Sequence, residues 1–157
     1  DSCLQWKDDN VMALNNYAYY LSEKGVDLHK AESMSYKTIK AEPNNGTYLD
    51  TYAWILFMEE RYADAKTYID QALKNRDSTA DNSTVLEHAG DIYYMNGMTD
   101  ESVDFWKKAY TGENQTEVLA WKIKNRQYIT EEELKKRNAP KQKPAATKKS
   151  VRKGKKK

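Results

Sequence analysis

The sequence predicts an all-α protein built from about three helical hairpins, with a C-terminal capping helix and a basic tail. The first observation is an eight-residue phrase that occurs three times, as LNNYAYYL, LDTYAWIL and LEHAGDIY, starting at Leu14, Leu49 and Leu86. The second is its spacing: apolar or small residues stand at i, i+3, i+4 and i+7, which is one face of an α-helix and not the alternation of a strand. The third is that the acidic residues end at Glu133 and a Lys-rich stretch follows.

Each phrase is followed by a second stripe with the same helical spacing, starting at Ala31, Ala65 and Ser102. The turn signals EKGVDLHK, MEERYAD and NGMTD separate the two stripes, so each unit is predicted to be a helical hairpin. A hairpin with one apolar face on each helix buries that face only by stacking on a neighbour, which explains the repetition. Close helix crossing requires small side chains. These are Ala18, Ala53 and Gly90 on the first helices and Ala31, Ala65 and Ser102 on the second.

The predicted elements follow one another along the chain. Residues 1–10 read as the end of an earlier hairpin and its turn. Because the sequence begins with Asp and not Met, we expect a processed or excised piece of a longer protein. Thr116 and Thr130 are predicted to cap two short helices. The later segments are three hairpins over 11–116 (11–45, 46–82 and 83–116), a capping helix with a short following helix over 117–136, and a disordered basic tail over 137–157.

This pattern resembles the tetratricopeptide repeat, whose framework is a large residue, Leu-Gly, Tyr, Ala, Phe, Ala and a closing Pro. Pro43 closes the first unit, and Ser35, Ser102 and the long loop NRDSTADNS depart from the framework. The resemblance implies a superhelix of α-α hairpins that acts as a protein-interaction scaffold. More narrowly, it implies the C-terminal repeats of a larger bacterial protein, in the cell envelope or periplasm, with the cytoplasm as the alternative. The second unit fits best, with Leu49, Tyr52, Ala53, Leu56, Ala65, Ile69 and Ala72 in the framework positions.

In this family the first helices form the inner wall that binds partners. Carried over by position, the resemblance implies a groove with an aromatic floor and acidic flanks. Such a groove suits an extended or helical peptide with apolar and basic residues. The alternative is that the aromatic side chains pack against the neighbouring hairpin. The predicted groove residues are Asn15, Tyr19, Asp50, Trp54, Phe57, Met58, Glu87, Asp91 and Tyr94, with Ser22 and Met95 at further wall positions.

Other chemistry is not predicted. A well-known variant of the repeat grips a C-terminal carboxylate with basic wall residues, but here the wall is acidic, so that function is rejected. His88 and Asp91 share a helix face, and two ligands make a poor metal site. The single cysteine, Cys3, excludes an internal disulfide. We expect no catalytic residues and no cofactor. The NGT, NST and NQT triplets match glycosylation acceptors, but we interpret them as turns and caps.

The net charge of +2 conceals a strong asymmetry. Residues 134–157 hold twelve Lys or Arg and no acid, so the preceding residues hold 14 basic and 24 acidic residues, a net charge of −10. The alternative function is therefore nonspecific association of the tail with nucleic acid or an anionic surface. The tail also resembles a bipartite nuclear import signal, and it is long enough to fold back on the acidic body. Self-association through exposed ends of the array is a further possibility. No apolar run approaches the roughly 18 residues of a membrane span.

Overall fold

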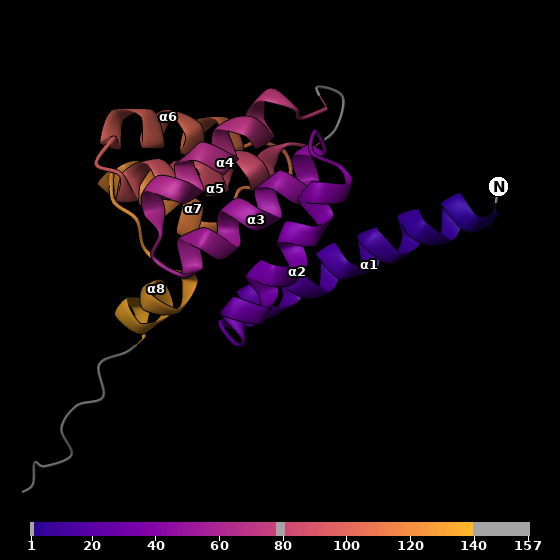
Figure 1. Ribbon diagram of the computed structural model, residues 1–157. Coiled ribbons are helices and arrows are strands. Elements are labelled where there is room, and N and C mark those ends of the chain that lie inside the picture. Colours follow the sequence, from indigo (N-terminus) through magenta and orange to yellow (C-terminus); the bar gives the residue numbers. More distant parts are fainter. Residues whose placement is uncertain (1, 78–80, 140–157) are drawn as a thin grey trace, which may run out of the picture.

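The structure is a computed structural model that describes the backbone of residues 2–77 and 81–139, with side chains from residue 10 onward. These residues form eight α-helices and no strand, which confirms the predicted all-α class (Figure 1). The helices are α1 (Ser2–Lys24), α2 (Leu28–Ala41), α3 (Gly46–Met58), α4 (Tyr62–Lys74), α5 (Ser83–Met95), α6 (Thr99–Ala109), α7 (Glu117–Asn125) and α8 (Glu131–Asn138).

Three successive pairs, α1–α2, α3–α4 and α5–α6, form the helical hairpins. Each hairpin turn contains a residue with positive φ at the corresponding place, namely Gly25 (67°), Glu60 (63°) and Gly97 (80°). Glycine adopts this left-handed conformation without steric cost, whereas in Glu60 the Cβ atom crowds the backbone and makes the conformation less favourable. The turns therefore follow the same repeat as the helices.

The small residues of the two stripes lie where the paired helices cross. Ala18, Ala31, Ala53 and Ala65 are completely buried. In the third hairpin the approach is closest, because a Cβ added to Gly90 would stand 2.3 Å from Cδ1 of Trp106 on α6. Short interaxial distances of this kind exclude larger side chains.

The N-terminal helix differs from the expectation for residues 1–10. The sequence suggested the end of one helix and a turn there, but α1 is continuous from Ser2 to Lys24, and its first half leads away from the other helices in Figure 1. Residues 4–10 contain neither Gly nor Pro, so nothing in their backbone chemistry interrupts the helix. The division of the chain into repeat units stays a prediction.

The third hairpin is closed by α7. Thr116 caps this helix by accepting a hydrogen bond from the backbone N–H of Leu119, and the Leu119 side chain is fully buried against Val103, Trp106 and Ala109. At the next helix, α8, Thr130 and Glu133 form a reciprocal capping box. Both predicted caps are therefore present.

Helix α8 ends at Asn138, so residues 137 and 138, which were expected to belong to a disordered tail, are helical. Lys135, Lys136 and Arg137 occupy its last turn, where positive charge interacts favourably with the helix dipole. Residues 140–157 and the predictions made for them lie outside the described part of the chain.

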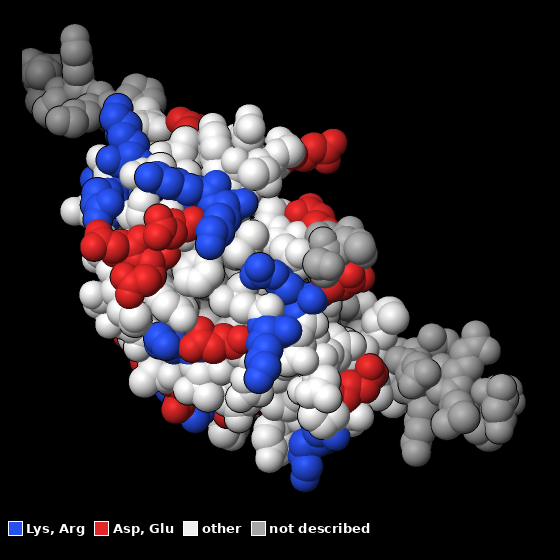
Figure 2. Space-filling model, turned by 90° about the horizontal axis from the view of Figure 1, so that it is seen from above, with Lys and Arg blue, Asp and Glu red and all other residues white. Residues whose placement is uncertain are grey.

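Two other surface features follow from the described residues. Over the face shown in Figure 2, acidic and basic side chains lie next to one another instead of separating into surfaces of one sign. None of the helices in 2–77 and 81–139 is long and apolar enough to cross a bilayer.

Among the glycosylation-like triplets, Asn45 acts as the predicted cap of α3, and its side-chain oxygen accepts a hydrogen bond from the Tyr48 N–H at 3.1 Å.

Candidate functional site

Two adjoining hollows lie on the side of the molecule that the first helices form. The amide hollow, about 760 Å³, is bordered by α1, by the start of α3, by the end of α4 and by the start of α5. The acidic hollow, about 600 Å³, is bordered by α1, α3 and α5 and by the chain from α7 to α8. Tyr19 and Thr84 line both hollows, so the two form one surface.

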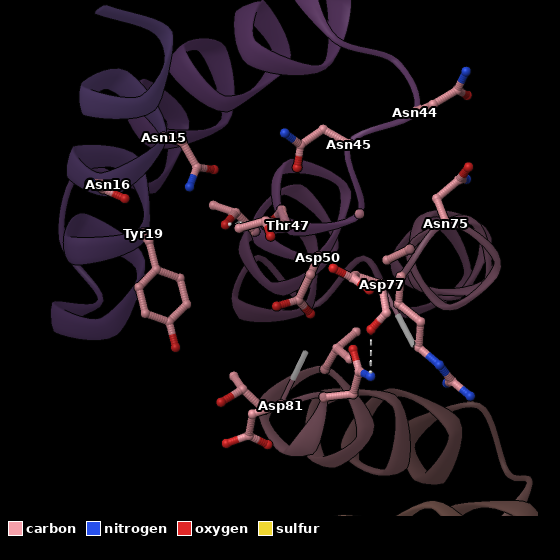
Figure 3. A pocket seen from close by; sticks show the side chains of 17 residues that line it. Asn15, Asn16, Tyr19, Asn44, Asn45, Thr47, Asp50, Asn75, Asp77 and Asp81 are labelled. Atoms are coloured by element: carbon pink, nitrogen blue, oxygen red, sulfur yellow. Dashed lines mark hydrogen bonds between the residues drawn. The ribbon is translucent and has the colours of Figure 1, made fainter. Parts of the chain in front are cut away.

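The structure distributes the nine predicted groove residues over three places. Asn15, Tyr19 and Asp50 line the amide hollow, where Figure 3 shows the side chains of these three residues directed into the space beside α1. Phe57 and Tyr94 instead pack into the interior, Phe57 in the main core and Tyr94 beside Trp106. The acidic hollow is lined by Tyr19 together with Trp54, Met58, Glu87 and Asp91.

Trp54 stands in the middle of an aromatic stack. Its ring lies parallel to that of Phe57 at 4.6 Å and to the imidazole of His88 at 4.1 Å between centroids, and only 8% of the residue is exposed. Tyr128, from the segment between α7 and α8, meets Phe57 edge-on at 5.6 Å. Trp54 thus makes the inter-hairpin contact of the alternative interpretation through His88, whereas Phe57 is covered by Tyr128, and little of either ring faces a ligand.

His88 forms a buried ion pair with Asp50 of the preceding hairpin, with Nδ1 and Oδ1 2.9 Å apart. Burial by itself lowers the pKa of His88, but the charge of Asp50 and its hydrogen bond outweigh that effect and raise the pKa above its ordinary value. The pair fixes the third hairpin to the second at the floor of the hollows. Its two members are 38 positions apart, so no local sequence pattern predicts their contact.

A second buried ion pair lies at the other end of the acidic hollow. The Lys122 ammonium donates to Asp91 at 2.8 Å and to Glu87 at 3.0 Å, and the Trp106 indole N–H donates to the same Asp91 oxygen at 2.9 Å. Burial lowers the pKa of Lys122, but the two carboxylates more than compensate and raise it. Asp91 is therefore engaged with α7 and α6 and is not a free acidic flank.

The sequence held one signal for this pair. Lys122 falls three residues after Leu119, on the helix face that packs onto the third hairpin, and its side chain is only 3% exposed. A lysine on a buried face needs a carboxylate partner. The capping helix predicted within 117–136 contains this lysine, but no partner was predicted for it.

The chain after α7 forms a wall that the sequence reasoning missed. Tyr128 and Ile129 follow the left-handed residue Arg126, which ends α7, and Ile129 is only 2% exposed. Thr130 then starts α8. The segment lies between two predicted helices, and the sequence offers no pattern that assigns it to the surface of the groove. Tyr128, Ile129 and Thr130 line the acidic hollow together with residues of α1.

Two of the predicted residues carry buried polar atoms without a hydrogen-bond partner among the described residues. These atoms are Oδ1 of Asn15, whose residue is 4% exposed, and Nε1 of Trp54. A buried polar atom that stays unpaired costs about 1–3 kcal/mol. The Asn15 oxygen is an acceptor whose side chain lies toward the amide hollow, whereas Nε1 of Trp54 belongs to a ring stacked in the interior.

A cluster of potential metal ligands lies on another part of the molecule. Ligand atoms of His29, Glu32 and Glu59 lie within 4.8 Å of one another. However, the Arg61 guanidinium is 3.0 Å from Glu32, and the Tyr52 hydroxyl donates to that carboxylate at 3.1 Å. The Glu32 carboxylate is therefore already engaged in an ion pair and a hydrogen bond. We interpret the cluster as part of a polar network that joins the first two hairpins.

No family model matches the chain. One curated relative is a TPR (tetratricopeptide repeat) repeat-containing protein of Pseudomonas aeruginosa, 35% identical over 66 residues. The match covers 42% of this chain and 11% of the relative, so the chain corresponds to a small part of that protein's length.

Solved structures of tetratricopeptide domains have the same fold. The first such domain of Spaghetti (RPAP3), bound to the HSP90 peptide SRMEEVD, matches with a TM-score of 0.64 and 13% identity, over 74% of this chain and 89% of that one. The N-terminal domain of STI-1 from C. elegans gives 0.58 and 20%, over 75% and 94%. The TPR2AB domain of yeast Sti1, in complex with pHSP90, gives 0.56 and 23%, over 83% and 48%. The resemblance to tetratricopeptide repeat proteins is thereby confirmed, and the chain has their fold.

Proposed function

We propose that this chain is a noncatalytic scaffold that binds a segment of another protein across the amide and acidic hollows. The observation that carries this proposal is the continuous surface of the first helices, together with the unpaired buried oxygen of Asn15, a residue that lines it. A peptide main chain offers regularly spaced N–H donors, which can pair with this oxygen. Two of the solved neighbours are themselves complexes with HSP90 or an HSP90 peptide, which supports this class of function.

The charges of the surface distinguish its partner from the acidic peptide of the Spaghetti complex. Glu23, Glu87, Glu131 and Glu132 line the acidic hollow, and Asp50 lines the amide hollow. A peptide rich in carboxylates would meet like charge here. The partner segment is therefore neutral or basic, with an apolar side chain beside Met58.

The ionisable groups deepest in the surface serve structure instead of catalysis. Asp50 is paired with His88 and Lys122 with Asp91, and each pair joins two elements of the fold. Proton transfer to a substrate would break these buried pairs and leave an uncompensated charge, which is costly. A binding surface supported by internal ion pairs describes this arrangement better than an active site.

The test is selection of peptides from a random display library on the immobilised protein, followed by affinity measurement with two matched variants. Tyr19→Ala removes the side chain shared by both hollows. Tyr20→Ala removes an equivalent ring from the same helix, where it is 54% exposed and lines neither hollow. We expect binding to fall at least about tenfold only for Tyr19→Ala, a loss of about 1.4 kcal/mol. Equal effects of the two variants would contradict the proposal.

The second candidate function rests on the basic residues near the C-terminus. Twelve Lys or Arg lie in residues 134–157, and such a segment binds polyanions with a steep salt dependence. An electrophoretic mobility assay with and without residues 140–157 separates this function from the first. A shift of any DNA sequence that requires those residues supports the second candidate, and a shift that persists without them contradicts it.

A further inference from the structure

We propose that the amide hollow is a subsite for an arginine side chain of the bound segment. This inference rests on the proposed function and adds the chemistry of the partner. It concerns one end of the surface, bordered by α1 and the start of α3, and it assigns the guanidinium to the space beside Asn15, Tyr19 and Asp50 (Figure 3).

The lining of this hollow is mostly polar and includes the amide and carboxylate oxygens of asparagines and aspartates, which are hydrogen-bond acceptors. Of its 17 lining residues, only Gly46, Ala72 and Val85 lack a polar side chain, and six of the others are asparagines. Asparagine and aspartate oxygens each accept up to two hydrogen bonds. An apolar side chain would displace water from these oxygens without offering them a hydrogen bond. A ligand with several N–H groups can instead donate hydrogen bonds to them.

Asn15 supplies the specific acceptor. It lies on α1 one turn before Tyr19, its residue is 96% buried, and its Oδ1 has no hydrogen-bond partner among the described residues. The side chain points from α1 toward the hollow in Figure 3. This oxygen has already lost its contact with water in the folded protein. A hydrogen bond from a ligand N–H would therefore remove an existing energetic penalty.

The charge of the hollow favours a cation. Three aspartates line it, and Arg76 is the one basic residue among the lining residues that the structure describes. Asp50 shares its charge with His88 through a 2.9 Å contact but still presents its carboxylate to the hollow. A cation entering beside Asp50 is attracted both by this carboxylate and by the acidic hollow next to it.

Arginine fits this site better than lysine. Its planar guanidinium carries five N–H donors and is more weakly hydrated than an ammonium group, so it suits a wide hollow with many dispersed acceptors. The ring of Tyr19 stands at the junction of the two hollows and offers a face for a guanidinium to stack on. A lysine has three donors around one point and would leave more of the acceptors unpaired.

The experiment uses a capped peptide, acetyl-Ala-Ala-Arg-Ala-Ala-amide, titrated into the ¹⁵N-labelled full chain at low salt. Matched peptides carry citrulline, which keeps the shape but has no charge, or lysine at the central position. We expect fast-exchange chemical-shift changes at the Asn15 side-chain amide and at backbone amides near residues 15–19 and 47–51. The apparent dissociation constant should rise at least about fivefold for citrulline and about twofold for lysine.

Variants test the assigned residues. Asn15→Leu removes the acceptor at similar volume and should weaken binding of the arginine peptide at least about fivefold. Asn15→Asp keeps an acceptor and adds a charge, so binding should be kept or strengthened, which separates recognition from damage to the fold. Asp104→Asn changes an exposed carboxylate on α6, away from the hollow, and should leave binding unchanged.

Equal affinities for the arginine and citrulline peptides, or shift changes confined to residues outside the amide hollow, would overturn the arginine subsite. Failure of this inference is distinct from failure of the proposed function. If selected peptides lack arginine but still require Tyr19 for binding, the proposed scaffold function is supported and the arginine subsite is contradicted. If Asn15→Leu and Tyr19→Ala both leave every selected peptide bound, the two proposals fall together.

Discussion

Lys122 on α7 and Asp91 on α5 form a 2.8 Å ion pair whose side chains are only 3% and 5% exposed. This contact holds the capping helix on the third hairpin at the place where the sequence predicted an open acidic flank. Glu87 shares the ammonium, and Trp106 adds a hydrogen bond to Asp91. Both members of the pair line the acidic hollow, where the ammonium of Lys122 partly neutralises the two carboxylates.

Removing the lysine should destabilise the fold strongly. Lys122→Ala leaves Asp91 buried without its counterion, a change that costs about 3–5 kcal/mol in comparable pairs. Urea denaturation followed by circular dichroism measures it. The control is Lys135→Ala, which breaks an exposed ion pair with Glu131 (75% and 70% exposed) and should change the free energy of unfolding by less than about 1 kcal/mol. Similar losses in the two variants would show that the buried pair has no special role.

The Asp50–His88 pair should make stability depend on pH. Because the pKa of His88 is raised in the folded state, protonation favours folding. The stabilisation is fully present below the unfolded-state pKa of about 6.5 and is lost as the pH rises through the folded-state value. We predict that the melting temperature of the wild type, relative to that of His88→Gln, decreases between pH 6 and pH 8.5.

The matched control for this prediction is His29→Gln, which removes the chain's other histidine from an exposed position. This variant should retain the wild-type dependence on pH. Asp50→Asn should abolish it, because the amide carries no charge to stabilise the imidazolium. A melting-temperature difference between wild type and His88→Gln that stays constant with pH would contradict the assignment.

Gly90→Ala should destabilise the third hairpin although alanine is the better helix former by about 1 kcal/mol. The new methyl group would stand 2.3 Å from Cδ1 and 2.4 Å from Nε1 of Trp106, whose ring is fully buried and cannot move freely. Overpacking of this kind costs about 1–3 kcal/mol. Denaturant midpoints of Gly90→Ala, Trp106→Ala and the double variant form a cycle. The alanine at 90 should cost little once the indole is gone, and strict additivity would argue against a clash.

The sequence predicted the helical hairpins because they follow from local information. The i, i+3, i+4, i+7 spacing, the small residues at the crossings and the Thr caps each act over a few residues, and the structure contains them. The prediction of a turn before residue 10 was wrong because it did not rest on the local residues. It was inferred from the position of the segment before the first repeat, whereas its own residues favour a continuing helix.

The candidate site was less predictable because it depends on contacts between distant segments. Asp50 and His88 are 38 positions apart, and Lys122 reaches Asp91 over 31 positions. Tyr128, in the segment after α7, contacts Phe57. Phe57 was predicted to lie on the wall from its position in the repeat, but it is part of the core. Position in the repeat predicts which side of the helix a residue occupies. It does not predict whether another part of the chain covers it.

Trp54 illustrates the consequence for mutagenesis. Its ring is stacked between Phe57 and His88, so truncation to alanine removes core packing, which costs about 3–5 kcal/mol for a buried tryptophan. Loss of binding in that variant would not separate recognition from folding. Tyr19 is the more informative position, because it is only half-buried and lines both hollows.

The exposed tyrosines of the first hairpin lead to the last prediction. Tyr17 and Tyr20 are 45% and 54% exposed and stack on each other at 6.4 Å. Their counterparts 35 residues later, Tyr52 and Ile55, are buried: Tyr52 donates to Glu32, and Ile55 packs into the cluster of the first hairpin. The repeat thus identifies this surface as the one on which a helical hairpin stacks, and here no described hairpin covers it.

We therefore predict that the chain self-associates weakly through this surface, since exposed apolar patches of this kind favour protein contacts. Sedimentation velocity of the wild type should show a weight-average mass that rises with concentration, and the double variant Tyr17→Lys/Tyr20→Lys should sediment as a monomer over the same range. Met95→Lys, which changes a 37% exposed apolar residue on the third hairpin, serves as the control and should behave like the wild type. A monomeric wild type, or equal association of both variants, would refute the prediction.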